Sequence, residues 1–145
     1  LCYCSRMRVR DLAWAAGIID GEGCITLYKA RSGAYVMKVN VTNCSYVMLH
    51  TMQAIFDCGY IIERKRLSLR HKRQWIWEAS TKNAERVLKA IEPYLVAKKE
   101  ECRLALLSRT LINAHGHNTP NRNVKKLDTL LIQLQKIKHV SSIPY

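Results

Sequence analysis

The chain has 145 residues, with 24 lysine and arginine residues against 11 aspartate and glutamate residues, which gives a formal net charge of +13 at pH 7. Hydrophobic residues make up 48% of the chain, which excludes an intrinsically disordered protein and predicts one domain with a sizeable core. No apolar run is long enough to span a membrane, and the charge favours a polyanionic partner, nucleic acid before an anionic membrane surface.

The first predicted element is a helix over residues 12–20, with Asp11 as its N-cap. The helix is apolar on nearly all sides, so we expect it to be buried on several faces. Gly21 and Gly23 free the backbone for a sharp exit and leave Glu22 at the end of the helix. Small residues let a second helix approach closely. Four residues at spacings of three and four form such a face: Ala13, Ala16, Gly17 and Asp20.

The next two predicted elements are strands, residues 24–31 and 35–42. They flank the glycine-containing loop Ser32-Gly33-Ala34, a pattern typical of a β-hairpin. Side chains alternate between the two faces of a strand, so Ile25 and Leu27 are predicted to face the core. Polar and basic groups gather on the outward face: Thr26, Tyr28, Lys38 and Asn40.

A helix is predicted over residues 46–58, with Ser45 as N-cap and Gly59 as stop. A second hairpin joins strands 60–67 and 74–80 through a strongly basic loop, and helices follow at residues 83–95, 97–113 and 123–139. Pro93 lies near the end of the first of these helices. This order predicts an α+β fold in a single domain, residues 1–145, with a core at residues 11–113 and a C-terminal helical extension at residues 120–140.

Residues 15–23 read A-A-G-I-I-D-G-E-G and run directly into C-I-T-L-Y. This run resembles the LAGLIDADG signature of homing endonucleases and their relatives, although a core helix with an incidental acid would show a similar pattern. The predicted order αββαββα, with added C-terminal helices, also resembles that family, which implies an antiparallel DNA-binding sheet. Asn43, in V-T-N, matches the polar residue that the family places at the end of the second strand. Lys98, in P-Y-L-V-A-K-K, matches the lysine that the family places at the start of the helix after the second hairpin.

The resemblance implies a magnesium-dependent endonuclease. Glu22 stands at the position of the family's metal-binding carboxylate, and with the Gly21 carbonyl it would supply the hard oxygen ligands that suit Mg²⁺. Asn43 would orient solvent, and Lys98 would offset charge on the phosphate. Since the chain holds one copy of the signature, the resemblance implies a homodimer, with the small-residue faces of two helices packed on a two-fold axis. The two Glu22 carboxylates would then meet over the minor groove.

In this family the strands form a saddle over the major groove, where alternate side chains reach base edges. Candidate base readers are Thr26, Tyr28, Lys38, Asn40, Arg64 and Arg66. In the second hairpin loop, contacts with phosphates or outer base pairs are expected from Arg70, Lys72 and Arg73. Trp75 and Trp77 are predicted to lie in the core, which leaves Gln74 and Ile76 on the DNA side. A solvated surface charge is the simpler interpretation of each basic residue alone, and their clustering favours DNA contact.

Three functions fit these features. The leading hypothesis is a homing endonuclease, encoded within a mobile intron, that makes a double-strand break in a long pseudo-palindromic DNA target. The second is an RNA-binding maturase that assists intron splicing, because one fold can serve both roles. The third is a non-catalytic DNA-binding protein of the same fold. Retention of Glu22 and Lys98 argues against the third.

The six cysteines, at positions 2, 4, 24, 44, 58 and 102, form no C-x-x-C pair and favour free thiols in a reducing compartment. We therefore expect an intracellular protein, in an organelle or in the cytoplasm. A zinc site of Cys2, Cys4, His115 and His117 is the alternative, and residues 115–118 could also suggest a histidine-based nuclease motif, although their context indicates a loop. The first ten residues lack the hydrophobic block of a secretory signal, and the start is expected at Met7 or within a longer reading frame.

Overall fold

The structure is a computed structural model that describes residues 7–113 and 123–140. It confirms an α+β fold with one antiparallel sheet in the order β1-β2-β4-β3. The elements are α1 (Val9–Glu22), β1 (Gly23–Lys29), β2 (Tyr35–Asn43), α2 (Tyr46–Phe56), β3 (Tyr60–Glu63), β4 (Trp75–Ser80), α3 (Thr81–Ile91), the 3₁₀ turn η1 (Glu92–Tyr94), α4 (Lys99–Asn113) and α5 (Val124–Val140). None of the helices in these ranges is long and apolar enough to cross a membrane. Cys2, Cys4, His115 and His117 lie outside the described residues.

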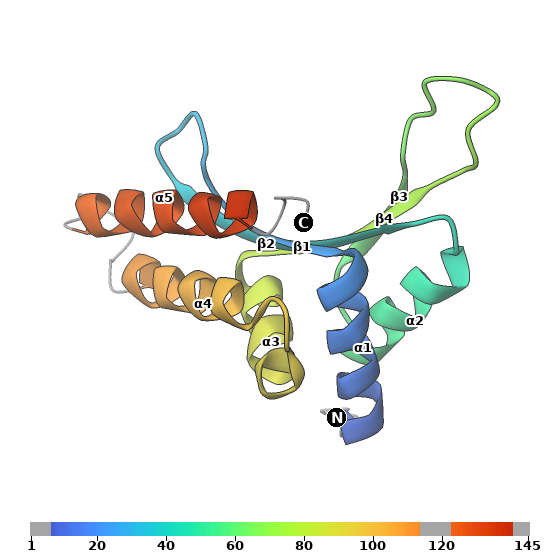
Figure 1. The fold of residues 1–145 in the computed structure, drawn as a ribbon, viewed down its shortest axis with the longest axis horizontal. Coiled ribbons are helices and arrows are strands. Elements are labelled where there is room, and N and C mark those ends of the chain that lie inside the picture. The colour runs from blue at the N-terminus through green and yellow to red at the C-terminus, as the bar shows by residue number, and fades with distance from the viewer. Residues whose placement is uncertain (1–6, 114–122, 141–145) are drawn as a thin grey trace.

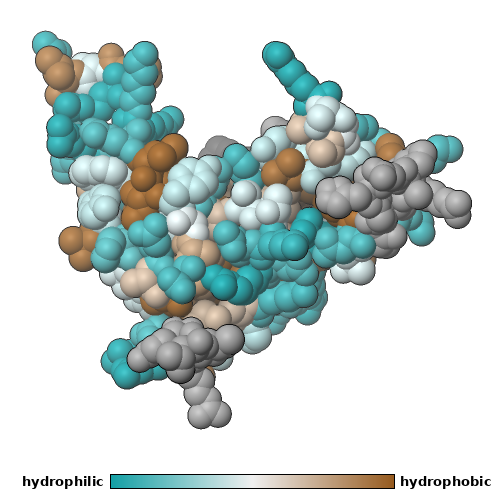
Figure 2. Space-filling model, turned by 180° about the vertical axis from the view of Figure 1, so that it is seen from behind, coloured by the Kyte–Doolittle hydropathy of each residue, from teal (hydrophilic) through white to brown (hydrophobic). Residues whose placement is uncertain are grey.

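The sheet divides the molecule into a covered face and an open face. Helices α1 to α4 lie on one side, and the loops of the two hairpins rise at opposite ends of the other side (Figure 1). Seen from behind, the two raised ends stand above a hollow between them (Figure 2). Helix α5 packs beside α4 and the edge strand β1. The open face is therefore a saddle that none of α1 to α4 covers.

The core lies between the sheet and the helices, as strand alternation predicts. On β1 and β2 the buried side chains are Ile25, Leu27, Tyr35, Met37, Val39 and Val41. Trp77 on β4 is fully buried and stacks on Phe56 of α2, with ring centroids 5.9 Å apart. Burial of these large apolar surfaces is the main stabilising term for a domain of this size.

Helix α1 is longer than predicted at both ends. It begins at Val9, and its N-cap is Arg8, which makes no side-chain capping bond, so the prediction of Asp11 as N-cap is wrong. Asp11 lies instead in the first turn, where a carboxylate still favours the helix dipole. The helix continues through Gly21 to Glu22. A side chain at Gly23 would place its Cβ 2.7 Å from both the Cα and the carbonyl oxygen of Ile19, so the exit into β1 requires glycine.

The second hairpin is shorter than predicted, because β3 ends at Glu63 and β4 begins at Trp75. A bond from the Arg64 amide to the Gln74 carbonyl, 2.8 Å long, continues the pairing, and the basic residues beyond it form a loop. Helix α2 begins as predicted, with the Ser45 hydroxyl accepting from the Met48 amide at 3.3 Å. It ends at Phe56, before the predicted stop at Gly59, and the left-handed residue Asp57 is its C-cap.

The C-terminal helices also differ from their predicted bounds. Helix α3 begins at Thr81, earlier than the predicted start at residue 83. It ends at Ile91, earlier than residue 95, because Pro93 lies in the 3₁₀ turn η1 that follows. Helix α4 was predicted to begin at residue 97. It begins at Lys99, because residues 97 and 98 form a turn. Helix α5 matches the prediction within one residue at each end, which is within the usual ambiguity of helix ends.

A semi-buried ion pair joins α3 to α4. Arg109 is only 8% exposed, and its Nε donates to Oε2 of Glu85 at 3.0 Å. Lys89 donates to the other oxygen of Glu85 at 2.7 Å. Lys89 first, and Arg109 second, lower the pKa of Glu85 against an opposing effect of burial.

Replacing this carboxylate tests the contribution of the ion pair. Glu85→Gln should reduce the free energy of unfolding at pH 7 by about 2 kcal/mol, because the Arg109 guanidinium loses its charged partner. A carboxyl group with a lowered folded-state pKa stabilises the protein above its unfolded pKa, and this contribution is lost as the pH falls through the folded pKa. The difference from wild type should therefore shrink below about pH 4. Urea unfolding at pH 7 and at lower pH measures both effects.

Glu100→Gln is the matched control for this experiment, because Glu100 is exposed and lies 3.8 Å from Arg103. We expect it to change stability by less than about 0.5 kcal/mol at either pH. Equal stability of the two variants at pH 7 would refute the role assigned to Glu85.

Candidate functional site

The end of α1 presents an acid at the surface. Glu22 is the last residue of the helix, and both Glu22 and Gly21 are exposed. Glu22 makes no hydrogen bond or ion pair with any residue in the described ranges. Because β1 begins at the next residue, Glu22 is the residue at which the helix meets the sheet; Figure 1 shows this junction of α1 and β1. It is therefore free to bind a ligand without loss of a structural contact.

Asp20 holds the segment of Val96 and Lys98 against this helix end. Its Oδ2 accepts from the Val96 amide at 2.8 Å, and its Oδ1 accepts from the Lys98 amide at 2.9 Å. The Lys98 ammonium in turn donates to the Asp20 carbonyl at 2.5 Å. These bonds bring Lys98 to the end of α1 that also carries Glu22, so two of the three predicted catalytic residues share one site.

Asn43, the third predicted catalytic residue, is the last residue of β2. Because Gly23 pairs with Val41, Asn43 lies at the end of the sheet that receives α1. Its Oδ1 accepts from the Ser45 amide at 2.8 Å, which fixes the side chain at the start of α2. The amide nitrogen has no partner among the described residues and is the group that could hold solvent.

A buried acid that was not predicted from the sequence lies beside this site. Glu101 is 5% exposed, and its Oε2 is buried without a hydrogen-bond partner in the described part of the chain. Burial raises the pKa of Glu101, while the nearby positive charges of Lys138 and Lys98 act in the opposite direction. The residue lines a hollow of about 230 Å³ together with Gly23, Cys24, Ala97, Lys98 and Lys138. In the sequence, Glu101 looks like an ordinary acid in the first turn of a helix, so no local pattern could have identified it.

The face of α1 that could contact a second copy differs from the predicted one. Ala16 is fully buried in the core, and Asp20 is bonded to the chain at Val96 and Lys98. Ala16 has no exposed surface in the single chain, and Asp20 is half-buried and bonded within it, so neither belongs to the exposed small-residue face of α1; the dimer interface itself stays a prediction. The exposed small residues are Ala13, Gly17 and Gly21, spaced four apart. A Cβ at Gly17 or Gly21 would meet no atom within 4 Å.

The open face of the sheet carries the outward residues predicted for β1 and β2: Thr26, Tyr28, Lys38 and Asn40. Strand pairing places them together, since Thr26 pairs with Lys38 and Cys24 with Asn40. Trp77 lies in the core as expected, and Trp75 is half-buried against Tyr46, with ring centroids 5.7 Å apart. Ile76 alternates onto the open face. The orientation of these strands is as predicted, and their contacts with DNA stay a prediction.

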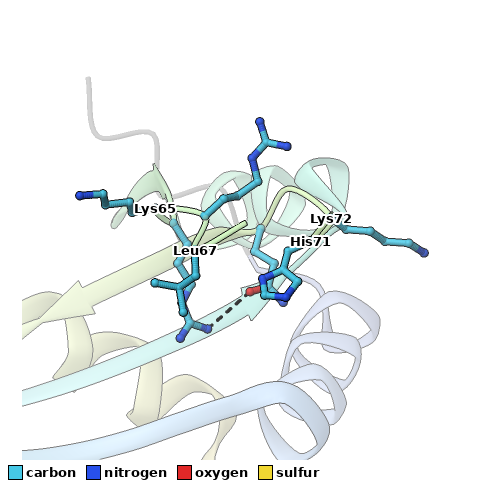
Figure 3. A pocket seen from close by; sticks show the side chains of 7 residues that line it. Lys65, Leu67, His71 and Lys72 are labelled. Carbon is cyan, nitrogen blue, oxygen red and sulfur yellow. Dashed lines mark hydrogen bonds between the residues drawn. The ribbon is translucent and has the colours of Figure 1, made fainter. Parts of the chain in front are cut away.

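The basic loop of the second hairpin rises at one end of the saddle. Its predicted DNA-contacting residues, Arg64, Arg66, Arg70 and Lys72, are all exposed. The loop encloses a hollow of about 330 Å³, and Figure 3 shows Lys65 and Lys72 extending away from it on opposite sides. The Arg64 guanidinium reaches Oε1 of Gln74 at 3.4 Å across the hairpin (Figure 3). Leu67 and Leu69 are largely exposed within this basic loop.

Comparison with known proteins identifies the family. A family model described as LAGLIDADG endonuclease matches residues 15–106, a span that includes the acid at the end of α1, Lys98 and all four strands. The chain belongs to the LAGLIDADG endonuclease family. A sequence comparison with curated proteins finds no match.

Solved structures share the fold at low sequence identity. The homing endonuclease I-CvuI, in complex with the I-CreI target in the presence of Mg, is 20% identical with a TM-score of 0.70, covering 90% of this chain and 85% of that one. The group I intron-encoded homing endonuclease I-CeuI, complexed with DNA, is 18% identical with a TM-score of 0.69, covering 90% and 69%. The LAGLIDADG homing endonuclease I-GzeII, in complex with its DNA target, is 16% identical with a TM-score of 0.70, covering 87% of this chain and 44% of that chain.

Proposed function

We propose that this protein is an intron-encoded, site-specific DNA endonuclease that acts as a homodimer and uses Mg²⁺ to cut both strands of a long pseudo-palindromic duplex. The observation that carries the proposal is the exposed, uncommitted Glu22 at the end of α1, the same helix end to which Lys98 is held by its bonds with Asp20. Membership of the LAGLIDADG endonuclease family and the DNA complexes of the similar structures support it.

The residues present fit a hard divalent cation. Glu22 offers a carboxylate, and the neighbouring backbone at the exposed Gly21 offers a carbonyl, both of which are ligands that Mg²⁺ accepts together with water and phosphate oxygens. The described residues contain no group of three His, Cys, Asp or Glu side chains that could hold a metal ion. One chain therefore supplies part of a coordination shell, and a second Glu22 and the DNA phosphates are the proposed source of the rest.

Each site residue has a distinct role in phosphodiester hydrolysis. A bound divalent cation supplies Lewis-acid stabilisation of the charge that develops on the phosphate. The Glu22 carboxylate would hold that cation, and the Lys98 ammonium, fixed by the Asp20 carbonyl, would offset negative charge on the phosphate. The Asn43 amide group, oriented by its bond with the Ser45 backbone, positions solvent.

The small-residue face of α1 supports the proposed homodimer. Ala13, Gly17 and Gly21 are exposed and leave room for a second helix at close range. Trp14 and Val9 are also exposed on this helix, and their apolar surface would be covered by a partner. The chain covers 44% of the length of I-GzeII, which is consistent with two copies of this domain forming one complete enzyme. A two-fold dimer presents the same saddle to both halves of the target.

A selection experiment followed by cleavage tests the proposed function. The protein is mixed with a library of randomised duplexes in Ca²⁺, bound sequences are enriched, and the enriched duplex is then incubated with Mg²⁺. We expect enrichment of a long sequence with two related halves, and Mg²⁺-dependent cutting of it. Tight binding of an intron transcript, with no duplex enriched or cut, would instead favour a maturase.

The basic loop should contribute affinity without sequence preference. Arg70→Ala should weaken binding to all duplexes alike and reduce the slope of log K against log salt concentration by about 0.9, the value for one lost phosphate contact. Fluorescence titrations at several salt concentrations, with enriched and scrambled duplexes, measure both effects. Arg103→Ala is the control, because Arg103 is also an exposed arginine but lies on α4, on the covered side of the sheet. A selective loss of affinity for the enriched duplex would contradict the assignment of Arg70 to phosphates.

A further inference from the structure

A negatively charged residue lies on the open face of the sheet, where a basic DNA-binding protein would be expected to avoid one. Glu78 of β4 receives two hydrogen bonds at the same oxygen, Oε1: from the Lys38 ammonium of β2 at 2.7 Å and from the Tyr60 hydroxyl of β3 at 2.5 Å. Its side chain is 14% exposed and that of Lys38 is 27% exposed. Three strands thus contribute to one polar cluster, Lys38, Tyr60 and Glu78.

Glu78 is held in its charged form. Burial raises the pKa of the carboxyl group, but the hydrogen bonds from Lys38 and Tyr60 lower it, and the net pKa lies below the ordinary value. A carboxylate on this face repels the phosphates of any duplex and reduces sequence-independent affinity. The general attraction of a basic saddle for DNA therefore does not account for Glu78.

The cluster leaves a specific set of hydrogen-bonding groups available. Oε2 of Glu78 accepts from no described residue, so one carboxylate oxygen can take a further donor. Lys38 has three N–H groups, of which one serves Glu78. The pair therefore offers two donors next to one acceptor, held in place by the short contact between them.

A guanine–cytosine pair offers the complementary pattern in the major groove. Guanine presents two adjacent acceptors, O6 and N7, which lysine can bond, and cytosine presents the N4 amine, which a carboxylate can accept. An adenine–thymine pair places its amine between two acceptors and would leave one lysine donor unmatched. The arrangement of donors and acceptor thus favours a guanine–cytosine pair.

We propose that Lys38 and Glu78 jointly read one guanine–cytosine pair in each half-site, with Lys38 on guanine, Glu78 on the paired cytosine, and Tyr60 holding Glu78 in position. This inference rests on the proposed DNA-binding function. It changes the role of Lys38 from an independent base reader to one half of a charge pair. A merely structural ion pair between these strands would stabilise the sheet slightly and would be insensitive to DNA sequence.

The test compares selected sequence profiles of wild type, Glu78→Gln and Lys38→Met, obtained from randomised duplexes in Ca²⁺. Glu78→Gln keeps the shape of the side chain and an acceptor for Tyr60. We expect both variants to lose the guanine–cytosine preference at the same position of each half-site, by about tenfold or more. Glu78→Gln should at the same time bind scrambled DNA more tightly than wild type, because one repulsive charge is removed.

Glu63→Gln is the matched control. Glu63 lies on the neighbouring strand, pairs with Arg73 at 3.4 Å, and carries the same charge, so its loss should raise affinity for scrambled DNA without altering the profile. Unchanged profiles in both cluster variants, or changes at two different positions, would overturn the inference while leaving DNA binding intact. A wild-type protein that enriches no sequence would instead refute the proposed function itself.

Discussion

Glu22→Gln should abolish cleavage of the enriched duplex while leaving its affinity for DNA nearly unchanged. The carboxylate is the proposed cation ligand, and a metal ion contributes several kcal/mol to stabilising the transition state, so the rate should fall on the order of 1000-fold or more. The fold should be unaffected, because Glu22 is exposed and has no bonded partner in the described structure. Single-turnover cleavage in Mg²⁺ and titration in Ca²⁺ separate the two effects.

Glu100→Gln provides the comparison, since it makes the same substitution at an exposed acid in the first turn of α4. It should cut at the wild-type rate. Cutting by Glu22→Gln at the wild-type rate with Mg²⁺ would show that the active site lies elsewhere.

Gly17→Leu should convert the proposed dimer to a single chain and thereby remove double-strand cleavage. Within one chain, a side chain at Gly17 meets no atom within 4 Å, and leucine favours a helix more than glycine does, so the domain itself should stay folded. Across a two-fold axis, two bulky side chains would meet where two glycines pack. Overpacking of this kind costs about 1–3 kcal/mol or more, which corresponds to a rise in the dissociation constant of roughly 5- to 150-fold or more.

Light scattering across a concentration series measures this change. Ala54→Leu adds a comparable apolar side chain at an exposed position on α2 and should leave the mass unchanged. A wild-type mass of one chain, both free and bound to DNA, would rule out the dimer.

Strand alternation and turn residues predicted most of the fold. They placed Ile25, Leu27 and Trp77 in the core and Thr26 and Lys38 on the open face, as the structure has them. These features were predictable because they depend on local sequence periods. The start of α1 at Val9, before Asp11, and the end of β3 at Glu63 were not predicted, because helix and strand ends depend on weak local signals.

The features of the site that the sequence did not predict have a different cause, namely contacts between distant parts of the chain. Helical spacing grouped Ala16 and Asp20 with Gly17, but it could not show that the Asp20 carboxylate accepts a hydrogen bond from the Lys98 amide. The pairing of Lys38 with Glu78 depends on β2 and β4 being neighbours in the sheet. The proximity of Glu101 to Lys98 likewise follows from tertiary packing. Residue identity indicated the chemistry of the site, and the fold determined which residues can carry it out.

Strand-resolved cleavage of the enriched duplex in Mg²⁺ is the most direct test of the account. A duplex labelled separately on each strand is incubated with wild-type protein, with and without chelator, and the product ends are mapped. We expect one cut on each strand, at positions related by the two-fold axis of the target, and no cutting when the divalent cation is removed. An intact duplex at excess protein in Mg²⁺, or one cut at scattered positions, would contradict it.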